Sequence, residues 1–201
     1  MKVKSILVSQ PEPQTAKSPY FELAEKNGLK IDFRPFIQVE GVPAKEFRQT
    51  RIQILEHSAV IFTSRTAIDH YFRIAQELRL TIPDTMKYFC ISEATAFYLQ
   101  KYIVFRKRKI FHSTGKFADL VDVIKKHKEE KFLLPCSEIH KQSISDQLES
   151  NNINYQKAVI YKTLANDLSG IPISEYDMLI FFSPSGVKSL FINFPEFKQN
   201  S

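Results

Sequence analysis

A duplicated segment constrains the fold of this chain more than any other feature. Residues 61–72 (IFTSRTAIDHYF) and residues 180–191 (IFFSPSGVKSLF) each run from apolar positions through a hydroxyl-bearing turn to aliphatic and aromatic positions at helical spacing. Each copy predicts a strand, a turn and the start of a helix. Such a turn offers hydroxyls and free backbone N–H groups to an anionic ligand. We therefore expect two α/β units of one kind, with the functional site in a cleft where the two turns meet.

The composition limits the class of protein. The chain has 201 residues, of which 43% are apolar, enough for one large domain or two small ones. Its formal net charge of +6 favours an acidic partner, which could be nucleic acid, anionic lipid or a polyanionic small molecule. No apolar run is long enough for a signal peptide or a membrane span. Because Cys90 and Cys136 end or follow apolar runs, they suit buried thiols in a reducing compartment, so we expect a cytoplasmic protein.

Strands and helices alternate along most of the chain. A helix that begins at Pro19 and stops at Gly28 lies between strands predicted at residues 3–9 and 29–33. The elements predicted next are a polar helix over residues 44–58, a strand over 59–63, a helix over 66–79, a strand over 88–91, a basic strand near 102–110 and a strand over 131–135. This alternation predicts parallel sheets that helices cover on both faces.

Two extended segments, residues 36–44 and residues 155–165, bracket the middle of the chain as strand-like linkers. They make the first domain discontinuous. We expect residues 1–36 and 164–201 to form a first α/β domain, and residues 37–163 to form a second one with the linker strands at its ends. The first domain then has about three strands and an unfinished sheet edge, so we expect it to be C-terminally incomplete.

Hydroxyl-bearing turns follow several of the predicted strands. Pro184 suits a first helical turn, and the small residue close behind it lets a ligand approach the N–H groups. Each serine could equally be a plain helix N-cap, but the presence of two matching turns favours a ligand site. The candidate binding residues are Thr63, Ser64, Ser92, Thr95, Ser183, Ser185 and Gly186.

Tyr161 is the candidate for chemistry. It lies in the second linker, and a linker between two domains borders the cleft between them. Its phenol could donate to a carboxylate or to a leaving hydroxyl, and the alternative is a tyrosine that only packs between domains. Cys136 and Ser137 repeat the strand-end arrangement, but no motif places a histidine beside Cys136, so a nucleophilic thiol is not expected.

Signatures of metal and nucleotide binding are missing from the sequence. The five histidines show no paired metal spacing, and neither a CxxC motif nor a glycine-rich phosphate loop is present, so we expect no metal and no cofactor. The basic run at residues 106–109 could contact phosphate, which would make oligonucleotide binding steeply salt-dependent. Charged residues that protect an edge strand explain the run equally well, and we expect no nucleic acid partner.

In their order along the chain, these motifs resemble the uroporphyrinogen-III synthase family. The likeness covers essentially the whole chain, and the resemblance implies two parallel-sheet α/β domains joined by a two-stranded β linker (HemD-like), with the active site in the cleft between them and no metal or cofactor. The matching segments are residues 6–13 (ILVSQPEP), 61–72 (IFTSRTAIDHYF), 91–96 (ISEATA), 133–137 (LLPCS), 159–163 (VIYKT) and 181–190 (FFSPSGVKSL).

The resemblance also implies a reaction. The family converts hydroxymethylbilane, a linear tetrapyrrole with eight carboxylates, to uroporphyrinogen III by losing water, closing the ring and inverting the last pyrrole. Such a polycarboxylate agrees with the basic charge of this chain. Tyr161 matches the family's linker tyrosine and would assist loss of the hydroxyl, while the candidate binding residues would hold carboxylates. We expect a monomer that acts on this small molecule without a membrane.

The sequence departs from the family after Phe197. Family members continue with another strand and a Gly-x-Thr-Thr-like turn, which this sequence does not show. Catalysis by the 201 residues alone is therefore open. The alternative function is a non-catalytic two-domain module that binds an anionic tetrapyrrole-like ligand.

Overall fold

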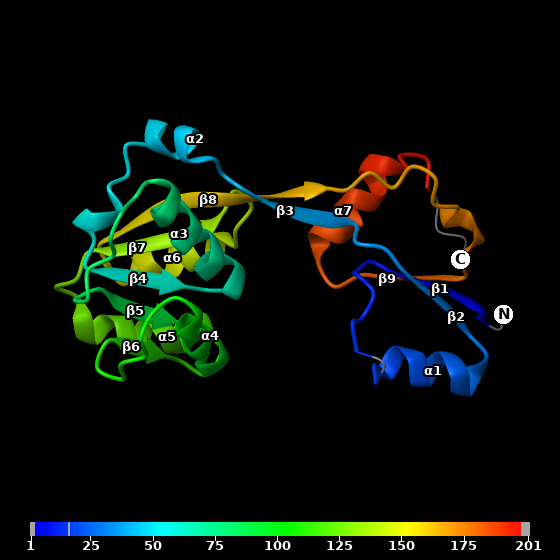
Figure 1. Ribbon diagram of the computed structural model, residues 1–201, viewed down its shortest axis with the longest axis horizontal. Coiled ribbons are helices and arrows are strands. Elements are labelled where there is room, and N and C mark those ends of the chain that lie inside the picture. Colours follow the sequence, from blue (N-terminus) through cyan, green and yellow to red (C-terminus); the bar gives the residue numbers. More distant parts are fainter. Residues whose placement is uncertain (1–2, 16, 198–201) are drawn as a thin grey trace. The chain divides into compact units, whose positions relative to one another are not determined.

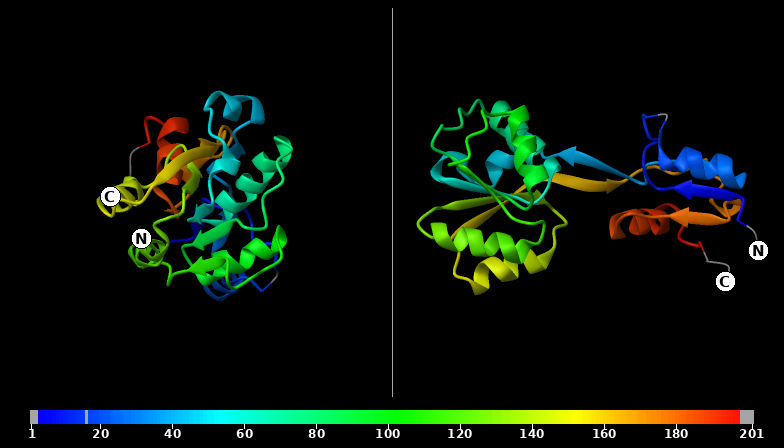
Figure 2. Two further views of the ribbon diagram at one scale, coloured as in Figure 1. Left: turned by 90° about the vertical axis from the view of Figure 1, so that its left-hand side faces the viewer. Right: turned by 90° about the horizontal axis from the view of Figure 1, so that it is seen from below.

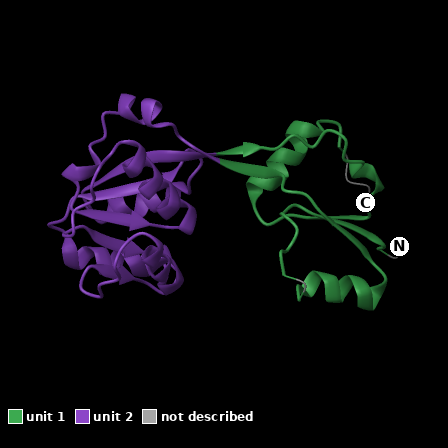
Figure 3. Cartoon of the chain, in the orientation of Figure 1, with its two compact units in different colours: residues 1–39, 163–201 green, residues 40–162 purple. Residues whose placement is uncertain are grey.

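The computed structural model describes residues 3–15 and 17–197. The chain divides into two compact units, unit 1 with residues 1–39 and 163–201, and unit 2 with residues 40–162 (Figure 3). Every strand pair whose register is described is parallel, which confirms the predicted α/β class with parallel sheets. No helix in the described ranges is both long and apolar enough to cross a bilayer.

Unit 1 holds a three-stranded sheet in the order β2-β1-β9 (Figure 1). Its strands are β1 (Ser5–Val8), β2 (Lys30–Phe33) and β9 (Met178–Ile180), and its helices are α1 (Pro19–Asn27), α7 (Pro184–Asn193) and the short 3-10 helix η4 (Ile173–Glu175). The core is small and consists of Leu7, Phe36, Leu168, Ile173 and Leu190. Because α1 buries none of its residues, its position depends mainly on its caps and on β2.

The caps of α1 follow from local sequence. Ser18 is the N-cap and its side chain accepts a hydrogen bond from the Tyr20 N–H, while Pro19 occupies the first turn, where no N–H is needed. Gly28 ends the helix in the left-handed conformation with φ 61°. That conformation is costly for residues with a side chain, so the predicted stop at Gly28 is confirmed with its physical cause.

Unit 2 is built on a six-stranded sheet in the order β3-β8-β7-β4-β5-β6, in which β3 and β8 also run across the division between the units. The strands are β3 (Ile37–Gly41), β4 (Ala59–Phe62), β5 (Lys87–Cys90), β6 (Ile110–His112), β7 (Phe132–Ser137) and β8 (Tyr155–Ala165). The helices are α2 (Ala44–Gln49), α3 (Arg65–Glu77), α4 (Glu93–Tyr98), α5 (Phe117–Ile124) and α6 (Gln142–Ser150), with the 3-10 helices η1 (Ile54–Glu56), η2 (Leu99–Lys101) and η3 (Lys125–His127).

Figure 2 shows helices on both sides of this sheet, and buried side chains lie on both of its faces. Along β4, Val60 and Phe62 point into the core that includes α3, and Ala59 and Ile61 point into the opposite core, which includes α5 and α6. Successive residues of a strand face opposite sides, so a strand buried on both sides has to be apolar throughout. That requirement explains the uninterrupted apolar run in the sequence of β4.

Two predicted elements are wrong. The helix predicted over residues 44–58 is interrupted, because Arg51 adopts φ 59° and Thr50 bonds the Phe47 carbonyl and the Ile52 N–H through its hydroxyl. A left-handed residue cannot continue an α-helix, so the segment contains only α2 and η1.

The basic strand predicted near residues 102–110 is also wrong. The Lys109 N–H donates to the Arg106 carbonyl at 2.9 Å, which closes a turn, and the strand β6 begins only at Ile110. Charged side chains in this run gain hydration by staying in an exposed turn, whereas Ile110 is buried against β5.

An ion pair near the amino end of the unit 2 sheet should make the stability of the protein depend on pH. Glu130, which is buried, accepts a short hydrogen bond from Lys87 at the start of β5. Burial alone would raise the pKa of Glu130, but hydrogen bonds from Lys87 and Ser58 outweigh burial, so this pKa is lowered. A lowered folded-state pKa contributes stability above the unfolded pKa, and that contribution is lost as the pH falls through the folded pKa.

We expect Glu130→Gln to lower the free energy of unfolding by about 1–2 kcal/mol at pH 7, because Lys87 loses its charged partner. The difference from the unsubstituted protein should shrink as the pH falls below about 4.3, the unperturbed pKa of glutamate. Denaturant titrations at pH 7 and at acidic pH measure both effects. Glu56→Gln, at an exposed glutamate, is the control and should change stability by less than about 0.5 kcal/mol. Equal stability of the two variants at pH 7 would contradict the assignment.

Candidate functional site

The carboxyl edge of the unit 2 sheet gathers most of the hydroxyls that the sequence singled out. Because β8, β7, β4, β5 and β6 are parallel neighbours, the turns that follow them lie at one edge. Ser137, the last residue of β7, pairs in register with Tyr161 on β8. The hydroxyl residues that the sequence singled out along this edge are, in the spatial order of the strands, Tyr161, Ser137, Thr63 with Ser64, and Ser92 with Thr95.

Ser64 connects the turn after β4 with Tyr161. It is the N-cap of α3, and its Oγ accepts a hydrogen bond from the Ala67 N–H at 3.0 Å. Burial raises the pKa of Tyr161, and the neighbouring Ser64 side chain partly offsets that rise. Ser64 therefore lies beside the Tyr161 phenol, which stays protonated at neutral pH.

His70 on α3 covers one face of Tyr161. The two rings are stacked with centroids 5.1 Å apart and planes at 19°. Arg73 Nε donates to His70 Nδ1 at 3.1 Å, and burial followed by the Arg73 charge lowers the pKa of His70. The imidazole is therefore neutral at physiological pH, with its proton on Nε2. His70 is not among the residues predicted from the sequence, where the histidines were tested only for metal-ligand spacing. The signal for it was Arg73, which lies one helical turn away.

The side chains of Ser92 and Thr95 are hydrogen-bonded to each other. Ser92 caps α4, accepting from the Thr95 N–H at 3.2 Å, and its Oγ lies 3.0 Å from Thr95 Oγ1. Thr95 is only 6% exposed. These two residues lie at the predicted edge, but Ser92 already caps α4 and the Thr95 hydroxyl is already hydrogen-bonded to Ser92.

Ser137 and Cys136 end β7 beside Tyr161. Ser137 Oγ is buried and has no hydrogen-bond partner among the described residues, which is costly for a hydroxyl and marks a place where a ligand or water can bind. Burial raises the pKa of Cys136 to about 11. The thiol therefore stays protonated at neutral pH, which agrees with the expectation that Cys136 is not a nucleophile.

The remaining predicted residues, Ser183, Ser185 and Gly186, belong to unit 1. Ser183 caps α7 by accepting from the Gly186 N–H at 3.3 Å. The side chain of Ser185, in the first turn of α7, has no hydrogen-bond partner among the described residues, so it can bind a ligand. Gly186 is buried, and a Cβ placed on it would lie 3.4 Å from the Phe181 ring and 3.7 Å from Ser9 Oγ.

Ser9 was missed by the sequence analysis. It follows β1 directly, and its N–H donates to the Ile180 carbonyl at 3.0 Å, so its hydroxyl lies beside the turn that begins α7. The signal was present in the sequence, because Ser9 follows an apolar strand in the same way as Ser64 and Ser183 follow theirs.

One group of side chains in the described part of the chain could hold a metal ion. It comprises His127, Glu129 and Glu130, whose ligand atoms lie within 4.8 Å of one another. Glu130 already binds Lys87, and the group precedes β7, at the end of the sheet opposite the hydroxyl-bearing edge. Its arrangement gives no reason to connect a metal with that edge.

Known proteins resemble this chain in sequence and in fold. A sequence model of the family described as uroporphyrinogen-III synthase HemD matches residues 18–201. No curated protein sequence matches the chain significantly. Among solved structures, a mutant uroporphyrinogen III synthase from the extremely thermophilic bacterium Thermus thermophilus is 15% identical, with a TM-score of 0.63 over 94% of this chain and 77% of that one. The uroporphyrinogen-III synthetase from Helicobacter pylori 26695 is 17% identical, with a TM-score of 0.59 over 98% and 80%.

At these identities the solved structures establish a common fold, with parallel-sheet α/β units like those described above. The family match supplies the identity, because it extends over most of the chain and includes the turns that begin α3, α4 and α7. The chain belongs to the uroporphyrinogen-III synthase family, whose members are cyclising lyases of haem biosynthesis.

Proposed function

We propose that this chain converts hydroxymethylbilane to uroporphyrinogen III, with loss of water and inversion of the last pyrrole ring. The observation that carries the proposal is the Tyr161 environment: the tyrosine of the family motif VIYKT lies at the hydroxyl-bearing edge of the sheet, paired with Ser137 and beside Ser64, and burial keeps its phenol protonated. A non-catalytic binding module would need no such protonated group. The family match also favours the enzyme over that alternative.

In the proposed first step, Tyr161 donates its proton to the terminal hydroxyl of the bilane. The carbon–oxygen bond breaks, its electron pair leaves with the oxygen as water, and the positive charge that remains is delocalised over the adjacent pyrrole as an azafulvenium ion. The phenolate formed on Tyr161 regains a proton when the last ring gives one up. The stacked imidazole of His70 keeps the phenol in one orientation.

Ring inversion requires the bilane to be folded before it closes unaided to the symmetric isomer. We propose that the bilane is held in the folded form by the cap hydroxyls of Ser64 and Ser183, by the hydroxyls of Ser185 and Thr63, and by backbone N–H groups at the helix starts, Gly186 among them. Ser64 and Ser183 use their oxygens as acceptors toward their own helices, so their O–H groups are left as donors. Donors of this kind bind carboxylates, and the net charge of +6 supports a polyanionic substrate.

Ser92 and Thr95 remain candidates for carboxylate binding through rearrangement of their mutual hydrogen bond. We further infer a monomer acting in the cytoplasm. The support is that Cys90 and Cys136 are both free and buried, as suits a protein of a reducing compartment.

We expect Tyr161→Phe to lower kcat for uroporphyrinogen III formation by about tenfold to a hundredfold with little change in KM, because it removes a general acid without removing the ring that stacks on His70. Because burial raises the pKa of Tyr161 above its ordinary value of 10, the contribution of this group should be constant from pH 7 to pH 9. Turnover of freshly made hydroxymethylbilane, with the product isomers separated by chromatography, measures the effect.

Tyr155→Phe is the matched control for Tyr161→Phe. Tyr155 lies on the same strand, and its hydroxyl donates to Glu149 at 3.0 Å on the other side of the unit. We expect this control to keep the turnover of the unsubstituted protein. Full activity of Tyr161→Phe would rule out the acid role of Tyr161, and formation of only the symmetric isomer by the unsubstituted protein would rule out the synthase function.

We expect Ser185→Ala to raise KM about fivefold to tenfold at nearly constant kcat, because one neutral donor to a carboxylate is lost, worth about 1 kcal/mol. Folding should be unaffected, since Ser185 is not the cap of α7. The control is Ser143→Ala, which removes an exposed serine from the first turn of α6. If KM for Ser185→Ala equals that of the control, Ser185 does not bind substrate.

A further inference from the structure

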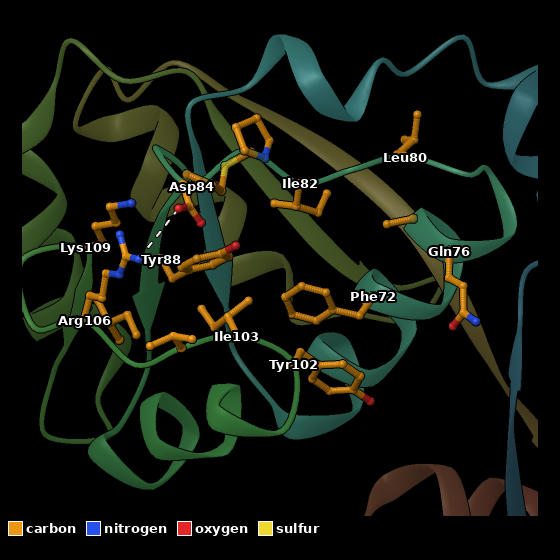
Figure 4. A pocket seen from close by; sticks show the side chains of 15 residues that line it. Phe72, Gln76, Leu80, Ile82, Asp84, Tyr88, Tyr102, Ile103, Arg106 and Lys109 are labelled. Carbon is orange, nitrogen blue, oxygen red and sulfur yellow. Dashed lines mark ion pairs between the residues drawn. The ribbon is translucent and has the colours of Figure 1, made fainter.

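A cavity of about 550 Å³ lies in unit 2 apart from the hydroxyl-bearing edge (Figure 4). Its walls come from α3, from the segment between α3 and β5, and from the loop that leads to β6. Tyr88 and Ile110, at the amino ends of β5 and β6, form part of its lining, whereas Ser92 follows the carboxyl end of β5. The volume is in the range of pockets that hold small organic ligands.

The body of the cavity is apolar and aromatic. Phe72 and Tyr102 are stacked with centroids 4.5 Å apart, and Phe72 and Tyr88 lie 6.5 Å apart in a tilted arrangement. Met86 and Ile103 add aliphatic contact area. In Figure 4, the Tyr88 ring lies between Phe72 on one side and Arg106 and Lys109 on the other. Flat aromatic walls of this kind favour a flat ligand.

The rim of the cavity on the side of the basic run is positively charged. Arg106 and Lys109 both line the cavity, whereas Lys107 and Arg108, between them in the sequence, do not. The single acid among the lining residues is Asp84, whose carboxylate lies 3.7 Å from Arg106. Its side chain is 88% exposed, so this ion pair is weak and readily replaced by an anionic ligand group.

Tyr88 places an unused hydroxyl inside the cavity. The residue is only 3% exposed, and its hydroxyl has no hydrogen-bond partner among the described residues. Burial, followed by the nearby Asp84 charge, raises the pKa of Tyr88, so the phenol is neutral and can donate. In Figure 4 the hydroxyl end of Tyr88 is turned away from Arg106, toward the apolar side of the cavity.

We propose that this cavity is a binding site for a small aromatic carboxylate. The ring system lies against Phe72 and Tyr88, the carboxylate binds Arg106 and Lys109, and an acceptor atom on the far side of the ring system accepts a hydrogen bond from Tyr88. The three recognition features are independent of one another and of the cyclisation reaction. The site would therefore bind ligand whether or not the chain turns over hydroxymethylbilane.

The experiment uses three probes in calorimetric titrations with the whole chain: 6-hydroxy-2-naphthoate, its neutral amide 6-hydroxy-2-naphthamide, and 2-naphthoate, which lacks the ring hydroxyl. The hydroxynaphthoate should bind most tightly. The double variant Arg106→Gln with Lys109→Gln should weaken binding of both naphthoates about tenfold, or about 1.4 kcal/mol, and leave the amide unchanged. Lys107→Gln with Arg108→Gln removes the same charge from the same run and should change neither.

Two further variants test the geometry. Asp84→Asn removes the carboxylate that competes for Arg106, so it should tighten binding of the naphthoates severalfold and leave the amide unchanged. Tyr88→Phe should weaken the hydroxynaphthoate severalfold while leaving 2-naphthoate unchanged, because only the first probe presents an acceptor to the phenol. Thermal melting of each variant checks that unit 2 remains folded.

Three results would overturn the proposal. One is the absence of binding by the hydroxynaphthoate at millimolar concentration. Another is equal binding of the acid and the amide. The last is an equal loss in the two double variants, which would mean that the basic run attracts anions without a defined site. Turnover of hydroxymethylbilane is not among the readouts, so the outcome is separate from that of the synthase assay.

Discussion

The Arg73 guanidinium holds together the parts of unit 2 on which the candidate site depends. From α3, its Nη2 donates to the Val42 carbonyl at 2.9 Å and to the Ile160 carbonyl at 3.2 Å, and its Nη1 binds Glu77 at 2.5 Å. Because Ile160 immediately precedes Tyr161 on β8, the bond from Arg73 fixes α3 against β8 next to the tyrosine. The arrangement also requires Gly41, because a Cβ there would lie 2.5 Å from the Arg73 guanidinium carbon. Without Arg73 the Val42 carbonyl would lose this donor, at a cost of about 1–3 kcal/mol, whereas the Ile160 carbonyl would keep the hydrogen bond from the Val42 N–H.

Three helix starts share one local geometry, and it gives their serines a common chemical property. Ser64, Ser92 and Ser183 all have extended backbones, and each side chain accepts from the N–H three residues ahead, at 3.0, 3.2 and 3.3 Å. The cap uses the part of each serine oxygen that faces the helix as an acceptor and leaves the O–H groups of Ser64 and Ser183 as donors, whereas the Ser92 hydroxyl lies 3.0 Å from Thr95 Oγ1. A feature that stabilises these helices thus also supplies hydroxyl donors, which is the kind of group that the proposed binding of carboxylates requires.

The sequence predicted local elements well where their signals are local. The bounds of α1 follow from Ser18, Pro19 and Gly28, and the extended segment over residues 155–165 is the strand β8. Prediction failed where conformation depended on a single backbone angle or on solvation. Nothing in the polar pattern of residues 44–58 shows that Arg51 turns left-handed. The apolar and β-branched start of residues 102–110 resembles a strand, but the charges at residues 106–109 are more favourable in an exposed turn.

The sequence alone determined the family, the parallel α/β class and the hydroxyl-bearing turns, because each is written in short-range patterns of apolar, small and hydroxyl residues. Only the tertiary structure decided which hydroxyls are free. It engaged Ser92 with Thr95, left Ser137 without a partner among the described residues and placed Ser64 beside Tyr161. It also brought His70 and Arg73 to that tyrosine, and Arg106 and Lys109 to an aromatic cavity. The physical reason is that hydrogen bonding, burial and pKa depend on neighbours from distant segments, which sheet register and helix packing bring together and which no local pattern specifies.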